Sequence, residues 1–135
     1  MFDSFLPGAA LLVTAWLFGG MLLFSAGFAA FVFKLLPVAE ARFLIRRAFP
    51  PFYLFVLGSA AIATALCWTV DRWSALVLGL IAITTVFARQ VLMPAINAAT
   101  DRGEKRRFAW LHGVSVLLTL SHIIVSAVVL IRLAT

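Results

Sequence analysis

Acidic residues are scarce in this 135-residue chain, and none of them lies inside a long apolar segment. The five carboxylates are Asp3, Glu40, Asp71, Asp101 and Glu104. Proton-driven pumps and cation carriers usually need an acidic group at membrane depth. Glycosidases and two-metal enzymes need paired or clustered carboxylates. The placement of the acidic residues therefore argues against all of these classes.

Cysteine and the common catalytic motifs are equally rare. The single cysteine, Cys67, has no partner for an internal disulfide. It completes the pattern Ser59-xxx-Ala63-xxx-Cys67, whose small side chains favour close packing of membrane helices. The sequence has no Gly-rich phosphate loop, zinc-spaced Cys/His cluster or nucleophile elbow. We therefore expect a non-enzymatic protein with no catalytic residues, no metal site and no cofactor.

Apolar residues, in contrast, dominate the chain. They make up 64% of it, against 12% charged residues, and no soluble domain of this length buries so much apolar surface. Four segments reach the length of about 20 residues that spans a bilayer: residues 8–33, 51–70, 74–93 and 108–133. We therefore predict an all-α membrane protein, a four-transmembrane-helix bundle in a single polytopic domain over residues 1–135. The first segment lacks a basic leader, which predicts a retained anchor.

The connections carry their own signals. Pro37 suits the first turn of a helix, and residues 38–48 are predicted to form a short interfacial helix between spans 1 and 2. Phe49-Pro50-Pro51 is expected to break the chain before span 2. The third span is expected to end near Pro94, and residues 97–107 to form a polar loop.

Basic residues are concentrated in two of the connections. They are Lys34, Arg42, Arg46 and Arg47 in the first and Arg102, Lys105, Arg106 and Arg107 in the third, whereas the opposite side carries only Arg72 and Arg132. The positive-inside rule then predicts cytoplasmic first and third connections and both termini on the outer side of a bacterial inner (plasma) membrane. This placement favours contact with anionic headgroups on the cytoplasmic side and argues against nucleic-acid binding.

One face of the last span carries a polar stripe. Its members follow one another at spacings of 3, 4, 3 and 4, within an arc of roughly 80° on a helix. They are His112, Ser115, Thr119, His122 and Ser126. Such a stripe is expected to face protein, water or a ligand rather than lipid. Two interpretations stay open: hydrogen bonding between helices, and a functional path or site.

Arg89 and the two histidines are the other notable groups at membrane depth. Arg89 lies roughly 7 Å before Pro94, near the cytoplasmic end of the third span. It either snorkels to headgroups or bonds the Gln90 carbonyl that Pro94 leaves without a donor, or it contacts an anion or partner inside the bundle. His112 and His122 lie about 15 Å apart on one helix, so one chain alone does not bind a haem iron with both. His122 residues from two chains of a symmetric dimer could meet, which leaves haem or metal binding as an alternative.

Four motifs occur in order along the spans: Phe31-Val32-Phe33-Lys34-Leu35-Leu36-Pro37, Phe49-Pro50-Pro51-Phe52-Tyr53, Ala88-Arg89-xxxx-Pro94 and His112-Gly113-Val114-Ser115. As an ordered set they resemble the transmembrane protein 205 family, which consists of small four-span proteins without a settled biochemical activity. The resemblance covers nearly the whole chain. It implies that the motif positions matter for fold or function: Pro37, Phe49, Pro50, Tyr53, Arg89, Pro94, His112 and Ser115.

A more distant likeness is to the copper-resistance-D and membrane protoporphyrinogen-oxidase type. In that type a first-helix histidine precedes a Trp and a Gly pair and binds haem. Trp16 and Gly19 are similar here, but Ala9 stands near the place of the histidine. We therefore expect a transporter-like unit or an accessory subunit of a membrane complex, either as a homo-oligomer or within a larger assembly. A haem- or metal-binding protein related to oxidoreductases is the alternative.

Overall fold

The computed structural model describes residues 2–135, and Met1 lies outside the described residues. The elements are α1 (Phe2–Leu22), the π-helical turn η1 (Leu23–Phe28), α2 (Ala29–Leu35), α3 (Val38–Val70), α4 (Arg72–Phe87), the π-helical turn η2 (Ala88–Leu92), α5 (Met93–Asp101) and α6 (Lys105–Ala134). Within the described part they form four helices long and apolar enough to cross a membrane. The predicted all-α, four-span architecture is confirmed.

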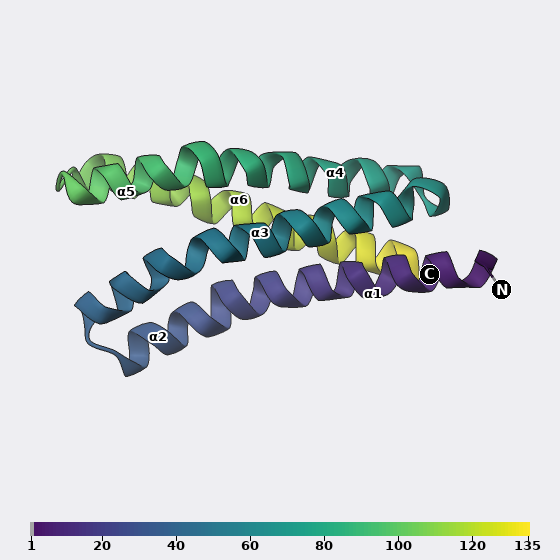
Figure 1. The fold of residues 1–135 in the computed structure, drawn as a ribbon, viewed down its shortest axis with the longest axis horizontal. Helices are drawn as coiled ribbons and strands as arrows, with labels where there is room; N and C mark the ends of the chain where they lie inside the picture. The colour runs from purple at the N-terminus through teal and green to yellow at the C-terminus, as the bar shows by residue number, and fades with distance from the viewer. Residues whose placement is uncertain (1) are drawn as a thin grey trace.

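The four spanning helices run alternately up and down (Figure 1). α3 packs against α1 and α4, and α6 packs against α1 and α5. The N- and C-terminal ends of the chain lie at the same end of the bundle, and the α2–α3 and α5–α6 connections lie at the other (Figure 1). The helices have 30 to 33 residues, or about 45–50 Å, so their ends extend beyond the roughly 30 Å hydrocarbon core of a bilayer.

The tightest helix pair is α3 and α4, which a single residue, Asp71, connects. The predicted seam of small residues lies inside the bundle, because Ser59, Ala63 and Cys67 are all buried. A Cβ atom at Gly79 would lie 3.6 Å from Thr64 Cγ2, which shows how close the two helices come. The seam predicted from the sequence is thus a packing surface in the structure.

Asp71 also joins α6 to the turn between α3 and α4 at one end of the bundle. Its carboxylate accepts a hydrogen bond from Arg132 Nε at 2.5 Å and another from Ser74 Oγ at 2.5 Å. These bonds, with Arg132 contributing most, hold the pKa of the Asp71 carboxyl well below its usual range. The C-terminal end of α6 is therefore connected to the α3–α4 turn by a charged contact at the membrane surface.

The interfacial segment differs from the prediction in one respect. Residues 38–48 are helical as predicted, but they are the first part of α3, and Phe49-Pro50-Pro51 does not break the chain. Proline fixes φ near −65°, which suits a helix, and its cost is the missing N–H donor. The carbonyls that lose their donors belong to Arg46 and Arg47, close to the helix end, where water and headgroups provide other donors.

Pro94 likewise does not end the third span. The helix continues to Asp101, and the predicted polar loop shrinks to residues 102–104. Pro94 lies in the first turn of α5, where a missing N–H is tolerated. The turn before it is π-helical, and Met93 N–H donates to the carbonyl of Ala88, one residue further back than in an α-helix. This wider turn accommodates the proline without a break.

Candidate functional site

The polar stripe follows α6 from an exposed end to a buried one. His112 is exposed and stacks on Phe108, with ring centroids 5.4 Å apart. Ser115 and Thr119 are half-buried, and His122 and Ser126 are buried. Only the C-terminal half of the stripe is therefore enclosed within the described bundle.

His122 forms the best-defined polar link of the stripe. Its Nε2 lies 2.7 Å from Thr84 Oγ1 on α4. The Thr84 hydroxyl also lies 2.7 Å from the carbonyl of Leu80. His122 Nε2 acts as donor or as acceptor in this contact with Thr84 according to the tautomer of the imidazole. This geometry joins α6 to α4 through a satisfied pair.

A second link joins the stripe to α3. The hydroxyls of Tyr53 and Ser115 lie 3.5 Å apart, and the Tyr53 side chain is 94% buried, with 6% exposed. The contact brings together two sequence motifs that lie far apart in the chain. Ser126 instead donates within its own helix, to the carbonyl of Ile123 at 2.9 Å. The stripe thus contains two interhelical contacts and one local one.

An aromatic cluster that the sequence analysis did not predict surrounds Tyr53. Phe24, in η1, stacks on Phe52 with ring centroids 4.0 Å apart and meets Phe49 edge-on at 5.4 Å. Phe49 also lies 5.7 Å from the Tyr53 ring. Edge-to-face and stacked pairs of this kind add about 0.5–1.5 kcal/mol each to packing. Two of the motif positions therefore have a clear structural role: Phe49 packs on Phe24 of η1, and Tyr53 packs on Phe49.

Arg89 lies in η2, half-buried, and its Nε is buried without a hydrogen-bond partner among the described residues. The ion pairs of that part of the chain involve other arginines. The contact of Gly79 with Thr64 fixes the register of α4 against α3, and that register puts Arg89 at about the level of Tyr53. The Arg89 guanidinium thus lies at about the same depth in the bundle as the Tyr53–Ser115 contact. Its Nε–H has no acceptor among the described residues.

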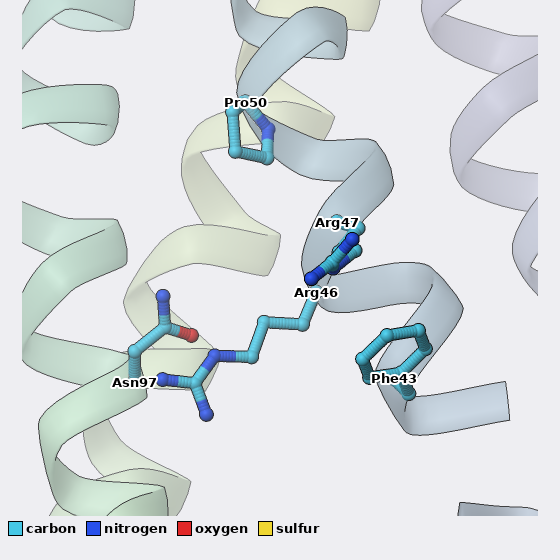
Figure 2. A pocket seen from close by; sticks show the side chains of 5 residues that line it. All are labelled: Phe43, Arg46, Arg47, Pro50 and Asn97. Carbon is cyan, nitrogen blue, oxygen red and sulfur yellow. The ribbon is translucent and has the colours of Figure 1, made fainter. Parts of the chain in front are cut away.

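A separate cleft lies at the end of the bundle where α3 begins and α5 ends (Figure 2). It has a volume of about 540 Å³ and is lined by Phe43, Arg46, Arg47, Pro50 and Asn97. Arg46 extends from α3 toward α5 (Figure 2) and holds Asp101 through two hydrogen bonds of 2.7 and 2.9 Å. Of the motif positions, Pro50 lines this cleft, Pro37 precedes α3 and Pro94 begins α5.

Four apolar spanning helices, joined inside by a few hydroxyl and imidazole contacts, define a multi-pass helical membrane protein. The family to which the chain belongs is described as a domain of unknown function, DUF4149, which matches residues 12–105. This match covers the first three spans and ends at the start of α6. The polar stripe of α6 lies outside it.

No curated protein and no solved structure matches the chain. The description of the family names no activity, and the membrane class is carried by the four apolar helices. The likenesses to the transmembrane protein 205 family and to the copper-resistance-D type remain predictions from the sequence motifs.

We expect replacement of His122 by leucine to change stability only slightly. Interhelical hydrogen bonds in membranes contribute about 0.6 kcal/mol on average, and packing carries most of the contact. Unfolding of His122→Leu, Thr84→Val and the double variant in mixed micelles would give the coupling energy directly. Ser121→Ala is the control, since Ser121 is exposed and bonds only within α6. A coupling energy indistinguishable from zero would contradict the His122–Thr84 bond.

Proposed function

We propose that this protein is a non-enzymatic, multi-pass subunit of a larger assembly in a bacterial inner (plasma) membrane. The proposal is carried by Arg89, a guanidinium inside a spanning helix whose buried Nε has no acceptor among the side chains and backbone that the structure describes. Charged groups at this depth generally pair with another group or line a hydrated cavity. A protein partner that contributes a carboxylate or carbonyl would complete the site.

The carboxylates of the chain are poorly placed to pair with Arg89. Its five carboxylates lie near the helix ends or connections, and those of Asp71, Asp101 and Glu104 are already engaged by other arginines. Arg89 lies at the level of a half-buried stretch of α6. The buried residues of this helix begin only at His122. An additional helix packed on this side of the bundle would cover the stretch and supply the acceptor.

An isolated transporter is the weaker candidate. A transport path would need hydrated space along the α6 stripe, whereas His122 and Ser115 pair with Thr84 and Tyr53 across the helix contacts. Two cavities lie at opposite ends of the bundle, one at Arg46 and the other at Asp71 and Arg132. Haem ligation through His122 Nε2 would similarly require that nitrogen to give up its contact with Thr84. The likeness to the transmembrane protein 205 family fits a small four-span protein without catalytic groups.

The assembly can be tested by native mass spectrometry of protein extracted from its own membranes in a mild detergent. The wild-type protein is expected to appear in a species heavier than one chain. Arg89→Leu is expected to lose that species yet keep its helical circular dichroism and melting temperature, because no acceptor in the described part of the chain loses its donor. Gln90→Leu is the matched control: Gln90 is exposed in the same turn and is expected to keep the assembly.

Two results would contradict the proposal. One is a wild-type protein that is monomeric in every extraction condition that preserves other membrane complexes. The other is an Arg89→Leu variant that assembles as the wild type does, since Arg89 would then have no part in partner contact. A heavier species made only of this chain would identify the partner as a second copy.

A further inference from the structure

The cleft at the start of α3 lies at the depth of lipid headgroups. Residues 51–70 of α3 are enough to cross the hydrocarbon core, since 20 residues extend about 30 Å. Arg46 and Arg47 precede this stretch by four or five residues, or about 6–8 Å along the axis. The headgroup layer on each side of a bilayer is about 5–8 Å thick. The two guanidiniums are therefore placed where phosphates of the adjacent leaflet lie.

The charges around the cleft favour a single negative group. Arg46 is neutralised by Asp101, which it holds through both terminal nitrogens. Arg47 makes no ion pair among the described residues, and its guanidinium lies over the Phe43 ring at 4.7 Å. The net charge of Arg46, Arg47 and Asp101 together is +1. One phosphodiester would balance that charge.

The remaining walls of the cleft suit an amphiphile. Asn97 contributes an amide from α5, which can donate to a phosphate oxygen, and the α3–α4 register puts it level with Arg46. Phe43 and Pro50 contribute apolar surface beside these polar groups. Guanidinium groups bind phosphate oxygens in a bidentate way, and basic pockets between spanning helices are suited to lipid headgroups. A soluble anion would make no use of the apolar side.

We propose that the cleft between the start of α3 and the end of α5 binds the phosphate of an anionic glycerophospholipid. Arg47 provides the main charge, Asn97 an amide donor, and Phe43 and Pro50 contact the glycerol and upper acyl region. Arg46 supports the site while it remains paired with Asp101. The charge bias of the connections assigns this leaflet to the cytoplasmic side. The proposal does not depend on the assembly proposed above, because the cleft and Arg89 are separate sites.

Native mass spectrometry of the purified full-length protein, titrated with phosphatidylglycerol or phosphatidylcholine in micelles, tests the site. The wild-type protein is expected to bind phosphatidylglycerol in preference to phosphatidylcholine. Arg47→Gln is expected to weaken phosphatidylglycerol binding about fivefold, the effect of removing one cation near a phosphate. Arg42→Gln removes the same charge from the same helix outside the cleft and is expected to leave binding nearly unchanged.

A second variant predicts a change of the opposite sign. Asp101→Asn removes the carboxylate that neutralises Arg46, and phosphatidylglycerol binding is expected to become tighter than in the wild type. A purely structural role of the Arg46–Asp101 pair predicts weaker binding instead. Unchanged melting temperatures for Arg47→Gln and Arg42→Gln would show that their difference arises at the binding site.

Three outcomes would overturn the proposal. Equal binding of phosphatidylglycerol and phosphatidylcholine would remove the requirement for net negative charge. Equal losses in Arg47→Gln and Arg42→Gln would show that the general positive field attracts the lipid and that the cleft has no special part. Displacement of the lipid by millimolar glycerol 3-phosphate would identify a soluble phosphate ester as the ligand.

Discussion

Replacement of Ala63 by leucine is expected to lower the melting temperature of the protein more than any other single change proposed for its core. Ala63 is fully buried on α3, next in sequence to Thr64, which Gly79 of α4 approaches. Lipid tails are as apolar as leucine, so helices associate in a membrane through close packing, which small residues permit. Overpacking a tight contact costs about 1–3 kcal/mol and would separate the two helices here. Thermal unfolding in detergent provides the measurement.

Ala65→Leu is the matched control for this substitution. Ala65 lies two residues along the same helix, but its side chain is exposed and faces away from the seam. Its replacement adds the same three carbons where lipid or detergent accommodates them. Equal melting temperatures for the Ala63 and Ala65 variants would contradict the close α3–α4 contact.

Reporter fusions after Gly103 and after Thr135 are expected to give opposite, all-or-none results. Both termini lie at one end of the bundle, and Gly103 lies in the connection at the other end (Figure 1). Most of the lysines and arginines are at the Gly103 end, so the positive-inside rule puts that end in the cytoplasm. A phosphatase fusion should be active at Thr135, and a fluorescent protein that matures only in the cytoplasm should be active at Gly103.

The two fusions separate two parts of the topology. Equal signals from both positions would contradict the last crossing, because α6 is the helix between Gly103 and Thr135. Opposite signals with the sides exchanged would leave the four spans intact and contradict only the orientation. A fusion after Asp71, which is expected to match Thr135, serves as the internal control.

The number of spans and the packing seam were predictable because each depends on residues close together in the sequence. A run of about 20 apolar residues specifies a crossing by its length alone, and Ser59, Ala63 and Cys67 specify a face by their spacing. The helix breaks predicted at Pro50 and Pro94 were wrong. Proline removes one N–H donor from a helix, but its fixed φ angle is compatible with a helix. Near a helix end, or next to a π turn, that cost is compensated.

Only one member of each polar contact between helices was predictable from the sequence. Helical spacing indicated that His122 and Ser115 lie on one face of the last span, and both are used in contacts between helices. Their partners, Thr84 and Tyr53, come from other helices, and finding them requires the register between helices. That register depends on the one-residue α3–α4 connection and on the two π turns, which leave no periodic signal in the sequence.

The π turn at Ala88–Leu92 also determines how the rest of its helix is oriented. A π turn inserts one extra residue, and one residue corresponds to about 100° of rotation around an α-helix. Every side chain after it is out of phase with the face that α4 presents to α3. Asn97 and Asp101 come after this change of phase, and they nevertheless reach the Arg46 side of α3. The same irregular turn thus contains Arg89 and sets the orientation of α5, whose Asn97 lines the cleft.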